Sequence, residues 1–333
     1  MFSTLRTRII LSTTVLLGGM VFLQAASAGD PGPLFFWTVR SQSATVHLLG
    51  SLHVGTEDMY PLDSTIEEAF ADSSSLVVEI DLDEQAQARA QRLGLEKGIY
   101  TDGTTLRDHL TPETFSLLEN YLSDRELPGV RFFGMKPWFV VQTLTLMEIA
   151  LLGYDPSLGI DQHFLRQARE AGKRIEEFES IDSQIGLLAG FSDELQELTL
   201  IHALRENEGV QRELEQVFEA WRNGDPEALD RLMREDLKED ARLRPVYERL
   251  FDERNARMVS RIREFLGTQG TYFVVVGAGH IVGEQGILNL LERQGSNAYS
   301  IHQHARAASA SDTPGARSYP SLTALQSYGY DHF

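Results

Sequence analysis

The sequence carries the same short histidine motif twice. Gly50-Ser51-Leu52-His53 follows the apolar run 46–49, and Gly277-Ala278-Gly279-His280 follows the apolar run 272–276. A branched aliphatic residue comes after the histidine in both copies, which lie more than 220 residues apart. A single Gly-x-x-His is unspecific, because short motifs often occur by chance. Two copies in matching contexts indicate a shared role.

The spacing suggests how such a pair would do chemistry. Sites in open α/β sheets form outside the carboxyl ends of the strands, and a glycine there lets the backbone turn sharply. Two such turns on neighbouring parallel strands would direct His53 and His280 into one cavity. Glu79 and Asp81, which end a third apolar run, would add carboxylates to its rim. Two histidines and a carboxylate are a common ligand set for zinc, manganese, iron or cobalt.

The elements that must position these residues form an α/β pattern. Hydrophobic periodicity and turn residues predict the following elements: a hairpin over 35–49, a helix over 63–72, strands over 75–81 and 271–276, a helix over 285–293 and a last strand over 297–301. Residues 84–265 are mainly helical in pattern, with room for a short strand within 173–180. The strand–helix–strand order before residue 84 suggests a parallel βαβ unit. We therefore expect a central, mainly parallel sheet with a large helical insertion at about 84–265.

The first 28 residues have the pattern of a secretory signal peptide. Arg6 and Arg8 precede an interrupted apolar stretch, and Ala26-Ser27-Ala28 offers a small-residue cleavage site. A membrane span would need about 20 predominantly apolar residues. We expect cleavage of residues 1–28, one domain over 29–303 and a flexible C-terminal tail over 304–333. The product would be periplasmic or secreted, without a stable membrane anchor.

The composition excludes several kinds of site. The chain has no cysteine, which rules out disulfides, thiolate metal ligands and a cysteine nucleophile. Its formal charge of −19 disfavours nucleic acid and anionic membranes as partners. No Gly-x-Ser-x-Gly nucleophile elbow is present, and Val282 stands where a dinucleotide motif needs its third glycine. A peptide or small molecule is the expected partner.

Other polar residues are better explained by structural roles. His47 lies in a strand pattern, and His163 and His202 lie in helical patterns, where packing or surface roles are expected. Lys136-Pro137-Trp138 is typical of a helix start with an aromatic anchor, since proline suits the first helical position. Asp161 is favoured as an acid in the first turn of a helix, with lining of the cavity as the alternative.

Taken together, these segments resemble the TraB/GumN-like family, which is also grouped with PrgY and related to the Tiki metalloproteases. The resemblance covers about residues 34–301 and depends on seven segments in order: Leu49–His53, Val77–Asp81, Lys136–Trp138, Gly159–Asp161, Phe178–Ser180, Arg254–Asn255 and Gly277–His280. It implies a fold similar to erythromycin esterases and the haem-associated ChaN proteins.

The resemblance also implies a site. In Tiki proteins the paired motifs and a glutamate are held to build a metal-dependent peptidase centre, which points to His53, Glu79 and His280 here. Arg254 matches a family arginine that would hold a carboxylate or stabilise an oxyanion. Glu179 is a further candidate for the same cavity.

Three functions remain open from the sequence. The first is a metal-dependent, peptidase-like hydrolase with a divalent ion (manganese, cobalt or zinc), in which His53, Glu79 and Arg254 are catalytic and His53, His280 and Glu79 hold the metal. The second is metal-free, esterase-like hydrolysis with a histidine as general base, oriented by Glu79. The third is binding of a peptide, a haem or a polysaccharide precursor without turnover.

Overall fold

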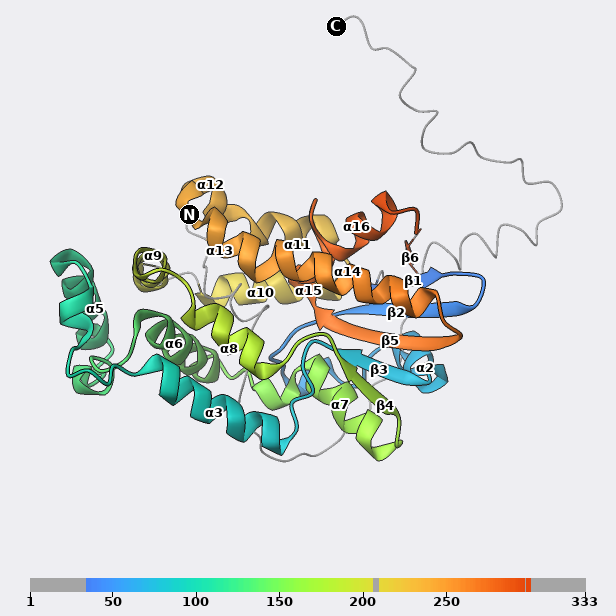
Figure 1. Ribbon diagram of the computed structural model, residues 1–333, viewed down its shortest axis with the longest axis horizontal. Helices are drawn as coiled ribbons and strands as arrows, with labels where there is room; N and C mark the ends of the chain where they lie inside the picture. The colour runs from blue at the N-terminus through green and yellow to red at the C-terminus, as the bar shows by residue number, and fades with distance from the viewer. Residues whose placement is uncertain (1–33, 206–209, 297, 301–333) are drawn as a thin grey trace, which may run out of the picture.

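A six-stranded sheet organises the chain, with helices on both of its faces (Figure 1). The structure, a computed structural model, describes residues 34–205, 210–296 and 298–300. The strands are β1 (Phe36–Arg40), β2 (Ala44–Ser51), β3 (Ser75–Val78), β4 (Arg174–Glu177), β5 (Gly270–Gly277) and β6 (Ala298–Ser300). The predicted signal peptide over 1–28 and the tail over 304–333 lie outside the described residues, as do both ends of the predicted strand 297–301.

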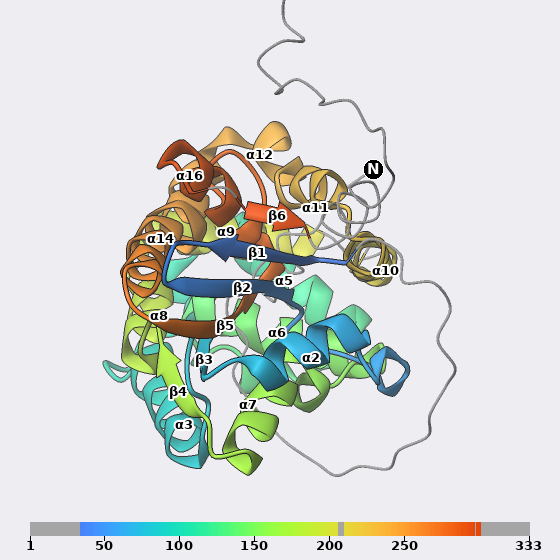
Figure 2. The same ribbon diagram turned by 90° about the vertical axis from the view of Figure 1, so that its right-hand side faces the viewer.

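The sheet has the order β4-β3-β5-β2-β1-β6, and Figure 2 shows this order from one end. β2, β3, β4 and β5 pair in parallel, whereas β1 lies antiparallel to β2 and to β6. The prediction of a mainly parallel sheet is therefore confirmed. β5 carries apolar residues on both of its faces. This suits a central strand, because helices cover both faces of the sheet.

β2 and β5 pair along their whole lengths. Ala44 lies opposite Gly270 at one end, and Ser51 lies opposite Gly277 at the other. β3 pairs with the other side of β5, so that β5 separates the two strands of the predicted βαβ unit. The unit is parallel as expected, but its strands are not adjacent.

The helices fall into groups set by the strands. Before β4 lie α2 (Ser64–Asp72), α3 (Glu84–Gly98), α4 (Leu106–His109), α5 (Pro112–Asp124), α6 (Pro137–Leu151) and α7 (Ile160–Glu170). Between β4 and β5 lie α8 (Ile181–Ala189), α9 (Asp193–Arg205), α10 (Val210–Arg222), α11 (Pro226–Met233), α12 (Glu235–Glu239), α13 (Arg244–Tyr247), a π-helical turn (Glu248–Asp252) and α14 (Glu253–Leu266). α15 (Ala278–Ile281) and α16 (Ile287–Arg293) follow β5. Short 3₁₀ turns occupy Glu57–Met59, Gly129–Arg131, Pro156–Leu158 and Ala241–Leu243. β4 thus divides the helical region in two.

Aromatic packing joins α2 and α7 to one face of the sheet. The ring of Phe273 in β5 lies 4.8 Å from Phe164 of α7 and 5.4 Å from Phe70 of α2, measured between centroids. α14 covers the opposite face (Figure 2). Trp221 of α10 donates its indole N–H to the Gly50 carbonyl at 2.6 Å, which fastens the helical region to the end of β2.

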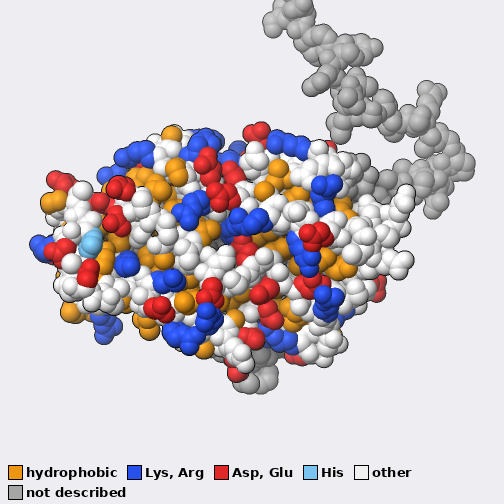
Figure 3. All heavy atoms as spheres, in the orientation of Figure 1, with side chains coloured by type: hydrophobic (Ala, Val, Ile, Leu, Met, Phe, Trp, Pro, Cys, Tyr) orange, Lys and Arg blue, Asp and Glu red, His pale blue; other side chains and the backbone are white. Residues whose placement is uncertain are grey.

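Acidic and basic side chains are interspersed over the face seen in Figure 3. None of the described helices is long and apolar enough to cross a membrane.

Candidate functional site

The two Gly-x-x-His turns leave the sheet side by side. Because Ser51 of β2 pairs with Gly277 of β5, both turns begin at the same edge. This edge faces the helical region in Figure 1, where β5 runs into α15. A Cβ on Gly50 would overlap the ring of Phe35, so the first turn requires glycine. His53 is 7% exposed and His280 is fully buried.

Glu79 lies between the two imidazoles. It directly follows β3, on the far side of β5 from β2. Its Oε1 is 3.7 Å from His53 Nε2, and its Oε2 is 3.7 Å from His280 Nε2. Both separations are too long for hydrogen bonds. Both Nε2 atoms are buried, and neither has a hydrogen-bond partner within the described part of the chain. Such buried polar atoms are rare in native structures and call for an explanation.

The other ring nitrogen of each histidine has a partner. His53 Nδ1 lies 2.9 Å from Asp161 Oδ1, and His280 Nδ1 lies 2.6 Å from Asn255 Oδ1. Asn255 in turn donates its side-chain N–H to the Gln285 carbonyl at 2.8 Å. Asp161 is in the first turn of α7, as the sequence favoured, and it also lines the site.

Arg254 fixes the carboxylate from the side of α14. Its side chain is completely buried, with one terminal nitrogen 2.5 Å from Glu79 Oε2 and its Nε 2.8 Å from Glu179 Oε2. The third guanidinium nitrogen donates to the Leu250 carbonyl at 2.9 Å. Of the two roles that the resemblance allows, the contacts favour holding a carboxylate. The Gly277 N–H adds a bond of 2.6 Å to Glu79 Oε1.

These contacts shift the pKa values of the three side chains in different directions. Burial acts to raise the pKa of Glu79, but His280, Arg254, His53 and the Gly277 N–H outweigh it and lower this pKa to about 2. Burial lowers the pKa of His280 to about 3. Burial acts in the same direction on His53, but the carboxylates of Asp161 and Glu79 raise its pKa above the usual value. The two histidines are therefore electrostatically unequal.

Two histidines and a carboxylate are side chains that bind divalent metal ions, and each histidine has a second contact of the kind that metal ligands usually have. Two ligands of a tetrahedral zinc ion, each at about 2.0–2.2 Å, lie about 3.4 Å apart, and each Nε2 is 3.7 Å from a Glu79 oxygen. Metal-binding histidines usually donate their second ring N–H to a carboxylate or carbonyl, as the contacts of His53 and His280 allow. The arrangement is not a finished coordination shell, since among residues 34–205, 210–296 and 298–300 no three such side chains already form a metal-binding group. Glu79 Oε1 accepts the Gly277 N–H with one of its two lone pairs, so metal ligation by the other lone pair would not require that contact to break.

Several polar residues lie outside this cluster. Asp81 pairs with Arg169 and does not join Glu79, because β3 ends at Val78 and the chain has turned by residue 81. His47 hydrogen-bonds Thr38 on the neighbouring strand, at 3.0 Å. His163 pairs with Glu67, and His202 pairs with Asp240, both away from the cluster. Lys136, Pro137 and Trp138 begin α6 as predicted, with Trp138 buried.

Sequence reasoning assigned no site role to two residues that the structure places in the cluster. From the sequence, Asn255 is named only in the pair Arg254–Asn255, although its spacing is a usable signal: Asn255 lies three and four residues before Met258 and Val259, on the apolar face of α14. Gln184 in α8 lies 3.4 Å from both Glu79 and Glu179. Its spacing is a usable signal, because Gln184 lies three residues after Ile181 and four before Leu188, on the apolar face of α8.

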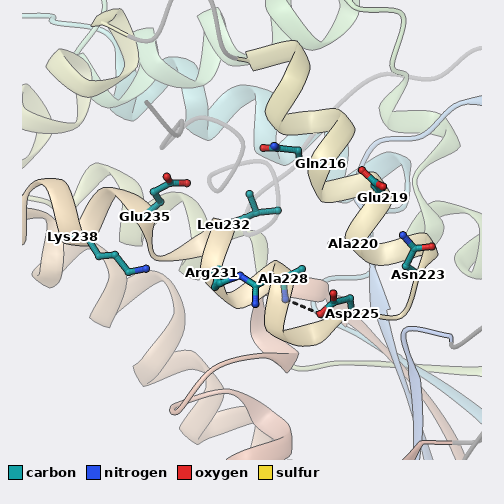
Figure 4. Close-up of a pocket in the computed structure, with 10 residues that line it drawn as sticks. All are labelled: Gln216, Glu219, Ala220, Asn223, Asp225, Ala228, Arg231, Leu232, Glu235 and Lys238. Carbon is teal, nitrogen blue, oxygen red and sulfur yellow. Dashed lines mark hydrogen bonds between the residues drawn. The ribbon is translucent and has the colours of Figure 1, made fainter. Parts of the chain in front are cut away.

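A separate surface hollow of about 470 Å³ lies between α10, α11 and α12 (Figure 4). Its rim mixes amide, acidic and basic side chains, among them Gln216, Glu219, Arg231 and Lys238. None of the residues of the histidine–carboxylate cluster lines it.

Comparison with known proteins places the chain in a family. A family model described as the TraB/PrgY/gumN family matches residues 35–298. The uncharacterized protein YbaP of Escherichia coli is 25% identical over 248 residues, which cover 74% of this chain and 87% of that protein. An uncharacterized protein of Treponema pallidum is 23% identical over 273 residues, which cover 78% of this chain and 80% of that protein. No solved structure matches the chain, so the likeness to ChaN proteins is untested. The match over nearly the whole described domain shows that the chain belongs to the TraB/PrgY/gumN family.

Proposed function

We propose that the chain is an exported, metal-dependent hydrolase that acts on peptides. The observation that carries the proposal is a pair of buried Nε2 atoms on two repeated turns, which have no hydrogen-bond partner among the described residues and lie 3.7 Å from different oxygens of Glu79. Ligands of this kind and number suit zinc, manganese or cobalt. Export rests on the signal-like pattern of residues 1–28.

Each residue has a definite task in this proposal. His53 and His280 would hold the metal, and Glu79 would serve as the third ligand or as the general base. A divalent ion bound there supplies Lewis-acid polarisation of a carbonyl and makes water acidic enough to ionise near neutral pH. Glu79 is ionised at neutral pH, because its pKa is lowered to about 2. This favours the ligand role over the general-base role, since an efficient general base has a pKa near the operating pH. Arg254 keeps this carboxylate in place.

The decisive experiment measures metal in the purified chain over residues 29–333. Wild type is compared with His53→Ala, His280→Ala and the control His163→Ala, whose ring contacts Glu67 instead of the cluster. Calorimetric titration with zinc, manganese and cobalt accompanies metal analysis. We expect one metal per chain in wild type and in the control, and none in the other two variants. Absence of metal from every sample, or its retention in His53→Ala, would refute the assignment.

A metal-free hydrolase is the second candidate, and one contact favours it. The His53–Asp161 pair at 2.9 Å has the geometry of a general base oriented by a carboxylate. The sequence assigned that orienting role to Glu79, whose oxygens are engaged instead by Arg254 and Gly277. Peptide hydrolysis that survives exhaustive chelation would support this candidate over the first. Stoichiometric peptide binding without product would instead indicate a binding protein.

A further inference from the structure

We propose that Asp161 and Asn255 are positioning residues for the two histidines of the repeated motif. Each holds its histidine with the ring proton on Nδ1, so that Nε2 presents a lone pair toward Glu79. Because one partner is a carboxylate and the other an amide, His53 is the stronger metal ligand of the two. The statement about ligand strength rests on the proposed function, whereas the statement about tautomers does not.

Asn255 has only one orientation that satisfies its surroundings. Its side-chain nitrogen lies 2.8 Å from the Gln285 carbonyl, which accepts hydrogen bonds and cannot donate them. The amide oxygen must therefore face His280 Nδ1, at 2.6 Å, and this nitrogen must carry the proton. Asn255 is 2% exposed and His280 is fully buried. The opposite tautomer would place two acceptors, His280 Nδ1 and Asn255 Oδ1, 2.6 Å apart with no hydrogen between them.

Asp161 is held against His53 by the backbone of α7. The Ile160 N–H donates to the Leu52 carbonyl at 3.0 Å, so the first turn of α7 is tied to the turn that carries His53. Gly159 permits this approach, since a Cβ there would lie 2.6 Å from the His53 carbonyl oxygen. An ionised carboxylate only accepts hydrogen bonds, and Asp161 Oδ1 is 2.9 Å from His53 Nδ1. This nitrogen, too, must be the donor.

Asp161 is a carboxylate and Asn255 is a neutral amide, although the two Gly-x-x-His motifs match. A carboxylate that accepts an imidazole N–H increases the basicity of the opposite ring nitrogen, and loss of such a partner weakens metal affinity about 10- to 100-fold. A neutral amide polarises the ring less, because hydrogen bonds to charged acceptors are stronger. Asp161→Asn should therefore weaken metal binding, whereas Asn255→Asp should leave it unchanged or tighten it.

The tautomers are measured directly by two-bond ¹H–¹⁵N correlation spectra. The sample is the metal-free chain over residues 29–333 with ¹⁵N-labelled histidine at pH 8, with assignments from His53→Gln and His280→Gln. We expect both histidines of the motif to be protonated on Nδ1 in wild type. Asn255→Asp should preserve this state in His280, and Asn255→Leu should abolish it. Protonation on Nε2 in wild type would overturn the inference, whatever the behaviour of the variants.

Zinc titration by calorimetry tests the unequal ligand strengths. We expect Asp161→Asn to bind zinc about 10- to 100-fold more weakly than wild type, and Asn255→Asp to bind at least as tightly. Equal affinity of Asp161→Asn and wild type would overturn the inequality. A further outcome is that wild type carries the proton on Nδ1 in both histidines and yet binds no zinc. In that case the metal-dependent function and the difference in ligand strength both fail, while the positioning roles of Asp161 and Asn255 are supported.

Discussion

Replacement of Arg254 by methionine should be among the most damaging changes to the stability of this chain. The guanidinium is completely buried and contacts Glu79 at 2.5 Å and Glu179 at 2.8 Å. Both carboxylates are less than a tenth exposed, so water cannot replace the lost cation, and the exposed Arg257, 3.4 Å from Glu179, would compensate little of the charge. Removal of one partner from a buried ion pair costs about 3–5 kcal/mol, because an uncompensated charge remains. We expect Arg254→Met to lower the free energy of unfolding by at least this amount.

A double-mutant cycle identifies the cause of that loss. Glu179→Gln should destabilise wild type, yet it should recover about 1–3 kcal/mol in the Arg254→Met background, where it removes one of two facing negative charges. The assay is urea unfolding of the metal-free chain at pH 7, followed by circular dichroism, with an unchanged denaturant slope. Arg261→Met on the same helix is the matched control. Its side chain is 46% exposed, so water screens its pairs with Glu176 and Glu264, and its loss should cost under about 1 kcal/mol. The reasoning fails if Arg254→Met matches this control, or if Glu179→Gln is equally destabilising in both backgrounds.

Two further predictions concern the sheet and the turn beside it. Burial lowers the pKa of His47 from 6.5 to about 4, so the folded state resists its protonation and stability falls as the pH drops from about 6.5 to 4. Over that window, wild type should lose about 1–3 kcal/mol more than His47→Gln in pH-dependent urea unfolding, and parallel curves would contradict this. Gly159→Ala should cost about 1–3 kcal/mol, because its Cβ would lie 2.6 Å from the His53 carbonyl oxygen. Gly186→Ala in α8, where a Cβ meets nothing within 4 Å, should be neutral or slightly stabilising in the same thermal-unfolding assay, and similar losses in both variants would refute the steric argument.

The parts of the fold that depend on local pattern were predictable from the sequence. The two apolar runs before the Gly-x-x-His motifs are β2 and β5, and the hairpin 35–49 contains the antiparallel pair β1 and β2. A break in the apolar pattern also located Glu79 at the end of a strand. The position of Asp81 at the end of the same apolar run, however, suggests that it would accompany Glu79. It does not, because β3 ends at Val78 and the backbone no longer alternates beyond that point.

The parts that depend on distant segments were not predictable. Asn255 reaches His280 because α14 packs over the turn after β5, and Asp161 reaches His53 because α7 begins against the turn after β2. Neither contact follows from periodicity, since periodicity assigns a residue to a face but does not name the opposing element. Periodicity likewise does not predict that β5 lies between β2 and β3.

That strand order explains why the cluster forms at all. Neighbouring strands lie about 4.8 Å apart, so the backbone turn that carries His280 lies between the turn that carries His53 and the backbone of Glu79, while the Glu79 side chain reaches both histidine rings. The three donors thus come from three adjacent strand ends, although more than 190 residues separate Glu79 from β5 in the chain. Closing so long a loop is entropically costly and becomes favourable only once β5 has paired with both neighbours. Metal affinity at this site would therefore be a property of the completed sheet, and a peptide spanning either motif alone, with one imidazole and without Glu79, should not reproduce it.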